Sequence, residues 1–437
     1  MPAALLRRLL LCLAVASPAI VLRITGLAPH PVLDLVVFGA AVVAASFVLA
    51  WAAEAAQKDI SGALAIAILA LIAVLPEYAV DLYYAFRSGS DPAYEQFAAA
   101  NMTGSNRLLL GLGWPLVALV ALGAARRAAG ASRRAAGASR GGARAPRRAA
   151  GMGRGPAFLQ LPSGSRLDLG FLAILAVVAF AIPLMGRIPV WFGIALIAVF
   201  IAYLWRAGQA PDDGEEEFVG AAALIVELPR RSRRATVIGL FVASAAVILA
   251  SAEPFADALV ASGTSLGIDS YVLVQWLAPL ASEAPEFIIA ILFALRGLGA
   301  AAITTLIASK INQWSLLVGS LPLAHLAGGG GTDLGLDARQ IEEFVLTATQ
   351  TVMGVAILLA LRFHRAGAIA LLALFALQFV VTGTEGRYVL SAVQVLVAAW
   401  SLGAHRHEIL PTLAAPFRRP AADADRAPQE RTPAPIA

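Results

Sequence analysis

Four acidic residues lie inside long apolar stretches of this chain, where an ionised carboxylate is costly. They are Glu77, Asp81, Glu283 and Glu286. Spacings of four and three residues place the two members of each pair on one face of a helix. Two such carboxylates repel each other unless a cation or a proton lies between them. The pairs therefore predict a binding site for sodium, calcium or protons within a membrane.

A proline directly precedes one glutamate of each pair. Pro76-Glu77 and Pro285-Glu286 open two similar apolar segments, which end at Arg87 and Arg296. Proline inside a helix removes a backbone donor and frees the carbonyl about four residues earlier. In a membrane this is tolerated where the freed carbonyl faces protein, water or an ion. Each segment therefore offers backbone oxygens beside a carboxylate, which suits a hard cation.

The apolar stretch after each Pro-Glu segment carries amide and hydroxyl side chains. These are Ser105, Asn106, Ser309, Asn312 and Gln313. An ungapped alignment that matches Pro115-Leu116 with Pro322-Leu323 pairs Asn106 with Gln313, and we prefer this register. A rival register pairs Ser105 with Ser309 but needs gaps. Such side chains either provide oxygen ligands to a cation or form the interhelical hydrogen bonds common in membrane proteins.

Two cations, Arg107 and Lys310, are predicted inside the helices that face the acids. We expect each of them to pair with one acid. Four carboxylates and two cations leave two negative charges, enough for one divalent ion, two monovalent ions or two protons. Alternatively, both cations only neutralise acids, which leaves a structural network and no ion site.

A further acidic pair, Glu253 and Asp257, lies in another apolar stretch beside Pro254. The spacing again places both carboxylates on one helical face. The pair either lines a pathway or is solvated near the outer end of its span, and the sequence leaves both interpretations open.

The composition is that of a membrane protein. The chain has 437 residues, of which 59% are hydrophobic and 14% charged, whereas about a quarter of a soluble domain is charged. The single cysteine, Cys12, excludes an internal disulfide framework and a cysteine-based metal cluster. The five histidines have no metal-ligand spacing, and no phosphate-binding loop or nucleophile-elbow motif occurs. We therefore expect no enzyme and no cofactor, only transported ions driven by gradients.

Twelve apolar stretches are long enough to cross a membrane as helices, which takes about twenty residues each. They are residues 4–24, 32–53, 61–86, 96–124, 167–185, 188–206, 235–261, 269–295, 299–325, 340–363, 366–382 and 387–404. The first follows Arg7 and Arg8, and we interpret it as a retained helix because no convincing cleavage site follows. The sequence thus predicts an all-α, polytopic membrane protein.

Arginines follow the even-numbered spans, which predicts that both termini are cytoplasmic under the positive-inside rule. The basic segments are expected to contact anionic lipids rather than nucleic acid. This topology places Glu77 on a helix that runs outward and Glu286 on one that runs inward. The two repeats are then inverted, as in many alternating-access transporters.

The predicted regions follow from this topology. They are an additional span at 1–30, a first repeat half at 31–206 with a basic loop at 126–155, a cytoplasmic linker at 207–234, a second repeat half at 235–383, an additional span at 384–405 and a disordered tail at 406–437. The two halves form a core of five plus five helices, with one extra helix at each end.

The repeats resemble those of the calcium/cation antiporter superfamily, which includes the sodium/calcium exchangers. The family's pattern is Gly-Thr-Ser-x-Pro-Glu followed by Gly-Ser-Asn-x-x-Asn and a leucine-rich run. The matching pieces are Pro76-Glu77, Pro285-Glu286, Asn106 to Gly111 and, more weakly, Gln313 to Gly319. Here Ala73-Val74-Leu75 replaces the first Gly-Thr-Ser.

The resemblance implies which residues bind the ions. Glu77, Glu286, Asn106 and Gln313 would be the central ligands, with the two glutamates as the metal-binding carboxylates and Ser282 and Ser309 as further contributors. The implied function is a secondary antiporter of the bacterial inner membrane, which exchanges calcium or another cation for sodium or protons. The alternative is a non-transporting protein of the same fold whose site is filled by Lys310 and Arg107.

Overall fold

The computed structural model of the chain describes residues 2–59, 74–138, 156–209, 218 and 220–418. Most of the predicted basic loop at 126–155 lies outside these residues, as do the first half of the predicted span at 61–86 and most of the predicted tail at 406–437. The elements described below all belong to the described ranges.

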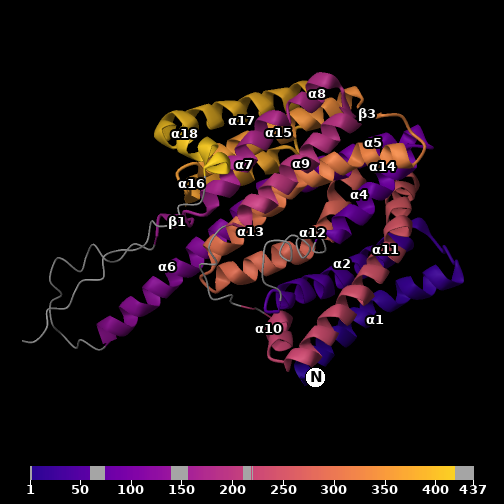
Figure 1. Ribbon diagram of the computed structural model, residues 1–437, viewed down its shortest axis with the longest axis horizontal. Coiled ribbons are helices and arrows are strands. Elements are labelled where there is room, and N and C mark those ends of the chain that lie inside the picture. Colours follow the sequence, from indigo (N-terminus) through magenta and orange to yellow (C-terminus); the bar gives the residue numbers. More distant parts are fainter. Residues whose placement is uncertain (1, 60–73, 139–155, 210–217, 219, 419–437) are drawn as a thin grey trace, which may run out of the picture.

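Helices dominate both halves of the chain (Figure 1). The first half contains α1 (Ala3–Thr25), α2 (Pro31–Ala56), α4 (Leu75–Ser88), α5 (Glu95–Leu108), α6 (Trp114–Ala138), α7 (Ser165–Val178), α8 (Ala181–Met185) and α9 (Val190–Ala207). The second half contains α10 (Gly220–Val226), α11 (Arg230–Leu266), α12 (Ser270–Leu295), α13 (Gly299–Asn312), α14 (Val318–Ala327), α15 (Ala338–Leu358), α16 (Arg365–Leu377), α17 (Thr384–Ala404) and α18 (Arg406–Ala414). The prediction of an all-α protein is confirmed.

Nine helical segments among the described residues are long and apolar enough to cross a membrane. The other three predicted spans correspond to shorter helices. They are α4, α13 with α14, and α16, in the stretches 61–86, 299–325 and 366–382. The sequence did not predict the short helices α10 and α18.

Four strands of three residues tie loops of the two halves together, and the sequence did not predict them. β1 (Phe158–Gln160) pairs with β4 (Arg362–His364), and β2 (Arg187–Pro189) pairs with β3 (Asp333–Gly335). Both pairs are antiparallel. Each pair joins the first half of the chain to the second, so the halves form one body.

The two repeats contain the same sequence of helical elements. In each, a 14-residue helix runs directly into a five-residue π-helix: α5 into η2 (Leu109–Gly113), and α13 into η4 (Gln313–Leu317). Both α13 and η4 begin 204 residues after their counterparts. This offset pairs Ser105 with Ser309 and Asn106 with Lys310, so the structure favours the rival register over the ungapped one.

The register prediction was wrong because it relied on the two Pro-Leu pairs. Pro115 is the second residue of α6, whereas Pro322 lies in the interior of α14. A π-helical turn inserts one residue into the backbone hydrogen-bonding pattern. The two π-helices are therefore better markers of equivalent positions than a shared dipeptide.

The helices pack in groups that surround the candidate site. The long helix α11 packs mainly along α2, and α1 covers both of them on one side of the molecule (Figure 1). On the other side, α15 packs against α17 and α5. Between these groups, α4 contacts α5, α11 and α14, and α12 contacts α5 and α13. The acid-bearing helices α4 and α12 therefore lie inside the bundle.

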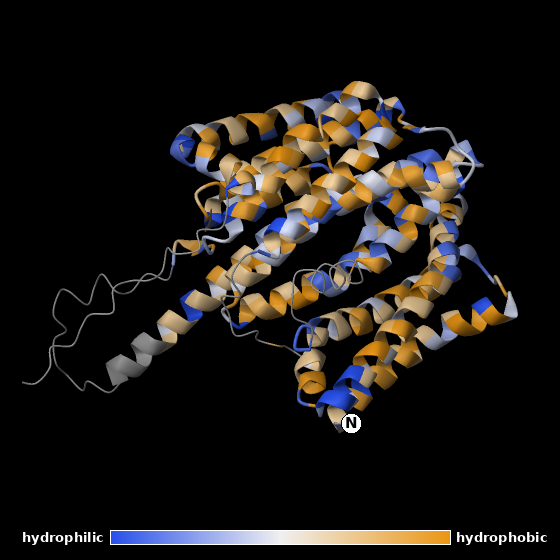
Figure 2. Ribbon diagram, in the orientation of Figure 1, coloured by the Kyte–Doolittle hydropathy of each residue, from blue (hydrophilic) through white to orange (hydrophobic). Residues whose placement is uncertain are grey.

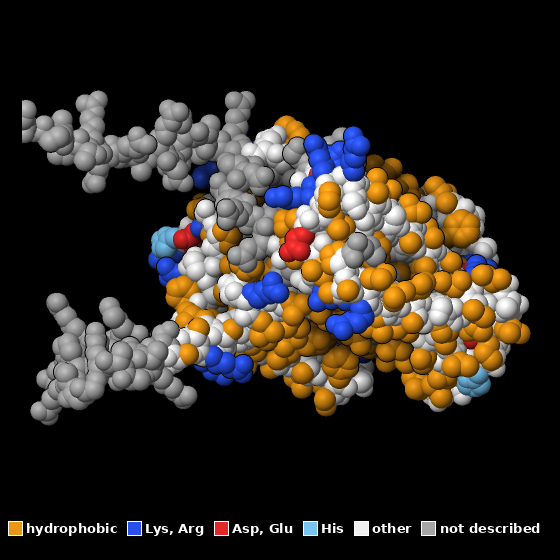
Figure 3. All heavy atoms as spheres, turned by 90° about the horizontal axis from the view of Figure 1, so that it is seen from below, with side chains coloured by type: hydrophobic (Ala, Val, Ile, Leu, Met, Phe, Trp, Pro, Cys, Tyr) orange, Lys and Arg blue, Asp and Glu red, His pale blue; other side chains and the backbone are white. Residues whose placement is uncertain are grey.

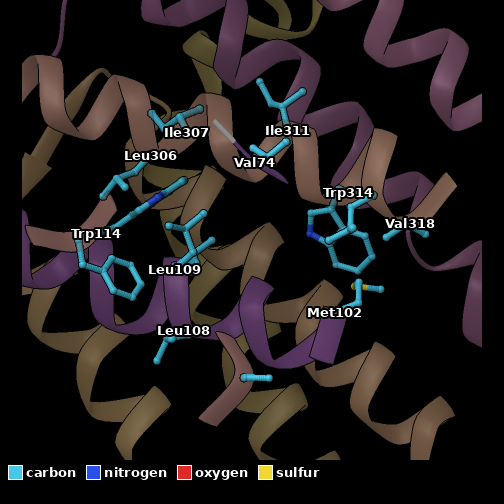
Figure 4. Close-up of a cluster of buried hydrophobic side chains, with 14 of the residues drawn as sticks. Val74, Met102, Leu108, Leu109, Trp114, Leu306, Ile307, Ile311, Trp314 and Val318 are labelled. Carbon is cyan, nitrogen blue, oxygen red and sulfur yellow. The ribbon is translucent and has the colours of Figure 1, made fainter. Parts of the chain in front are cut away.

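A single large apolar cluster surrounds the two π-helices. Figure 4 shows Leu109 and Trp114 from the first repeat, and Ile307, Ile311 and Trp314 from the second, within this cluster. The two tryptophans are almost completely buried. Because such close packing resists rearrangement, the cluster fixes the helices that carry the polar side chains.

Hydrophobic residues predominate along most of the helices (Figure 2). Several large apolar side chains are almost fully exposed, among them Ile24, Leu184 and Trp400. In water these would be unfavourable, but a lipid bilayer solvates them. The surface thus agrees with the membrane-spanning helices.

Candidate functional site

The candidate site lies where α4, α5, α12 and the α13–η4 segment meet. Glu77 and Asp81 on α4 are buried, and so is Glu283 on α12. Glu286 is partly buried one turn further along α12. Pro76 is at the start of α4, while Pro285 lies inside α12. The structure thus brings both Pro-Glu segments into the bundle interior.

Gln313 connects the acids of the two repeats. Its amide Nε2 donates to Glu77 Oε1 at 3.1 Å and to Glu283 Oε1 at 2.7 Å. The amide belongs to the second repeat, and its two acceptors come from different repeats. Glu77 and Glu283 therefore lie within reach of one small group, as a shared binding site requires.

The remaining amides and hydroxyls contact the same helices. Ser309 Oγ donates to Glu286 Oε2 at 3.0 Å. Tyr78 on α4 donates its hydroxyl to Asn312 Oδ1 at 3.0 Å, which again joins the two repeats. Ser282 Oγ bonds to the carbonyl of Ala278 in its own helix and not to an acid. Ser309, Asn312 and Gln313 therefore lie among the acid-bearing helices as the sequence predicted.

Asn106 contributes mainly through its backbone. Its Nδ2 donates to the carbonyl of Met102 at 3.0 Å, and its own carbonyl accepts Lys310 Nζ at 2.6 Å. The Nζ atom of Lys310 also lies 5.8 Å from the ring centroid of Trp314, in a cation–π contact. No carboxylate lies within ion-pairing distance of Lys310 among the described residues, so the predicted pairing of Lys310 with an acid is wrong.

Arg107 is directed away from the candidate site. Its Nη2 lies 2.5 Å from Glu343 Oε2 on α15, and both side chains are almost completely buried. Arg387 of α17 also pairs with Glu343 and, at 3.3 Å, with Glu342. One residue along a helix is a rotation of about 100°, so Arg107 faces a different neighbour from Asn106. The predicted pairing of Arg107 with a site acid is therefore wrong.

Two contacts of the site were not predicted. Asn101 Nδ2 donates to Asp81 Oδ1 at 2.8 Å, and the hydroxyl of Tyr78 reaches Asn312. Asn101 is a lone amide in an alanine-rich part of a predicted span, which is a signal that the sequence contained. Tyr78 gives no such signal, because a tyrosine beside a Pro-Glu pair is equally typical of apolar packing.

Several buried polar atoms of the site have no hydrogen-bond partner among the described residues. They are the oxygens Asp81 Oδ2, Asn101 Oδ1, Ser105 Oγ, Asn106 Oδ1, Glu283 Oε2 and Gln313 Oε1, together with the nitrogen Asn312 Nδ2. A buried polar atom without a partner costs about 1–3 kcal/mol. Six of these seven atoms are oxygens, the ligand atoms that hard cations such as Ca²⁺ and Na⁺ take. These oxygen atoms are therefore suitable ligands for a transported cation.

Two sets of buried acids from two repeated halves of a polytopic helical bundle define the class of the protein, a membrane carrier for cations. The chain belongs to the sodium/calcium exchanger protein family, whose profile matches residues 30–208 and 236–383. The family, the fold class and the absence of an enzymatic role were all predicted correctly from the sequence.

Solved structures agree with this assignment. The chain is 35% identical to the H⁺/Ca²⁺ exchanger CAX, over 95% of this chain and 98% of that chain, with a TM-score of 0.84. It is 15% identical to native YfkE, covering 89% and 99% of the two chains, with a TM-score of 0.55. It is also 15% identical to the sodium-calcium exchanger NCX_Mj in 10 mM Na⁺ without Ca²⁺, over 81% of this chain and 100% of that chain, with a TM-score of 0.50. The last two likenesses concern the fold alone. No curated protein sequence matches the chain.

Proposed function

We propose that the protein is a secondary antiporter that moves Ca²⁺ against protons or sodium by alternating access. The bridge from Gln313 to Glu77 and Glu283 is the observation that carries this proposal. It places carboxylates of both repeats around one centre, where a divalent cation would gain from both. The likeness to the H⁺/Ca²⁺ exchanger CAX supports Ca²⁺ as the cargo and protons as the first counter-ion to test.

The two glutamates of the Pro-Glu motifs keep the roles that the resemblance implied. Glu77 and Glu286 are proposed as the central carboxylates, with Asp81 and Glu283 one helical turn or less away. Gln313 positions two of these carboxylates. The oxygens of Asn106, Asn312, Ser282 and Ser309 are proposed as neutral ligands or as groups that orient the acids.

The alternative is a non-transporting protein whose site is filled by a tethered cation. Arg107 does not support it, because this side chain pairs with Glu343 outside the site. Lys310 alone remains, and its ammonium is held by the Asn106 carbonyl. Transport therefore has more support than a plugged site, since one held ammonium leaves most of the carboxylate charge free for cargo.

Uptake of ⁴⁵Ca²⁺ into proteoliposomes tests the proposal, with a proton or a sodium gradient as the driving force. We expect Glu77→Gln and Glu286→Gln each to reduce uptake about 100-fold, since losing a desolvated charge costs about 3 kcal/mol. Asp168→Asn is the matched control, because Asp168 is also buried but accepts from Tyr203 outside the site. A wild-type protein silent under every gradient, with transport only in Lys310→Met, would establish the plugged alternative.

The orientation in the membrane is proposed from the charge pattern. We place the protein in the inner membrane of a bacterium with both termini in the cytoplasm. Figure 3 shows several basic side chains on the face that contains the start of α1, α10 and the start of α11. Its exposed cations are Arg7, Arg8, Lys58, Arg230, Arg231 and Arg234. Such a patch suits anionic lipid headgroups at the cytoplasmic surface.

A further inference from the structure

Asp81 and Asn101 form a polar pair one helical turn away from the central carboxylates. Asp81 lies four residues beyond Glu77 on α4, which corresponds to about 6 Å along a helix. Asn101 comes from α5 and donates to Asp81 Oδ1 at 2.8 Å. Both side chains are 0% exposed. The pair is therefore adjacent to the candidate site but separate from the bridge made by Gln313.

The free oxygens of this pair lack hydrogen-bond donors. Asp81 Oδ2 and Asn101 Oδ1 are both buried, and neither has a donor among the described residues. Leaving a carboxylate oxygen and an amide oxygen buried without a partner is costly, and a bound cation would supply the missing partner. The hydrogen-bonded pair thus presents two further oxygens without partners, the atom type that ligates a hard cation.

The second repeat has no such pair. Counting from the two Pro-Glu motifs, the residue equivalent to Asp81 is Ala290. By the offset of the π-helices, the residue equivalent to Asn101 is Thr305, which is exposed and bonds to its own helix at Ala301. Any role of the pair is therefore restricted to the α4 side of the central site.

Along α4, Asp81 lies between Glu77 and two tyrosines that contact α11. Two turns beyond Glu77, Tyr84 donates to the carbonyl of Ala256 at 3.0 Å and Tyr83 donates to Asp257 Oδ1 at 2.8 Å. Asp257 borders a cavity of about 370 Å³ between α1, α2 and α11, which Asp34 also lines. Along α4, the order is therefore Glu77, Asp81 and the two tyrosines, and Tyr83 contacts Asp257 at the border of the cavity.

We propose that Asp81 and Asn101 form a relay subsite that holds the divalent cation on its way between the cavity at Asp257 and the central carboxylates. The inference rests on the proposed function, because it names a step in the path of the same cargo. One carboxylate and one amide oxygen bind a divalent cation weakly, with water as the remaining ligands. A weak intermediate site suits transit, since an ion must leave it as readily as it enters.

Sidedness of transport tests the relay. In membrane vesicles of both orientations, the initial rate of ⁴⁵Ca²⁺ uptake is measured against Ca²⁺ concentration. Asp81→Asn should raise the apparent KM about tenfold when Ca²⁺ arrives from the side of the cavity, because it removes the one charged ligand of the proposed subsite and ligand charge sets the affinity of an oxygen site. Little change is expected from the other side. Asn101→Ala should raise the same KM about threefold, since it removes one neutral ligand.

Asp168→Asn again serves as the control for loss of a buried aspartate, and Asp257→Asn repeats the test at the cavity if Asp81→Asn does not fold. Both Asp81 and Asp257 variants should shift KM from the same side. Equal shifts from both sides, or none, with normal wild-type uptake would overturn the relay and leave the proposed function intact. Absence of wild-type uptake would instead refute the proposed function.

Discussion

The buried ion pair of Arg107 and Glu343 lies outside the candidate site, and substitutions in this pair test whether Arg107 stabilises the bundle rather than the ion site. The two side chains are 1% and 0% exposed, and their charged atoms lie 2.5 Å apart. Removing one partner of such a pair costs about 3–5 kcal/mol, because the other charge stays buried and unpaired. We expect the loss of stability in Arg107→Met to be at the lower end of this range, since Arg387 still neutralises Glu343. The loss in Glu343→Gln should be at the upper end, because two arginines then share Glu342.

Chemical denaturation of the purified protein in detergent measures these losses. The double variant Arg107→Met/Glu343→Gln should be more stable than the sum of the single losses by about 2 kcal/mol, the coupling typical of contacting residues. Arg187→Met is the control, because Arg187 pairs with Asp333 at the surface, where an ion pair contributes less than about 1 kcal/mol. Additive losses, or normal stability of Arg107→Met with loss of ion binding, would refute the reasoning and return Arg107 to the site.

Two further predictions concern packing and pH. A Cβ at Gly104 would overlap the backbone oxygen of Gln275, so Gly104→Ala should force α5 from α12, cost about 3 kcal/mol and weaken Ca²⁺-dependent stabilisation. Gly123→Ala, with open space around its Cβ, should leave the thermal midpoint unchanged or slightly raised, and equal behaviour of the two variants would contradict this account. The Arg233 guanidinium that bonds to Asp59 holds the pKa of this carboxyl below its ordinary value. The contribution of this ion pair to folding stability is therefore fully present above the pKa of Asp59 in the unfolded chain, about 3.9, and is lost as the pH falls through its lower pKa in the folded protein. The midpoint difference between wild type and Asp59→Asn should shrink from about pH 6 to pH 3, and a constant difference would count against the pair.

The acid-bearing helices could be predicted because their signals are local. Carboxylates three or four residues apart, each pair beside a proline, mark a helix face within one or two turns. The apolar spans are equally local, so the sequence also indicated the apolar helical segments and the repeat. The short strands were not predictable in this way, since three residues carry no periodic pattern.

The partners of the two cations could not be predicted from the same signals. Arg107 and Glu343 are far apart in the chain, and which helix Arg107 faces depends on its rotation about α5. The π-helices shift the rotation of the residues that follow them by one residue, and the sequence contains no clear mark of them. Lys310 illustrates the same point, because its partner is a backbone carbonyl and every helix offers those.

The contact between Lys310 and Asn106 has a further consequence for the site. These residues occupy equivalent positions in the two repeats, and equivalent residues of inverted repeats can touch only near the axis that relates the repeats. The centre of the protein therefore carries an amide from one repeat and an ammonium from the other. This ammonium lowers the negative charge available to a cation by one unit. Because ligand charge sets the affinity of an oxygen site for Ca²⁺, the asymmetry should weaken binding and so speed release of the cargo.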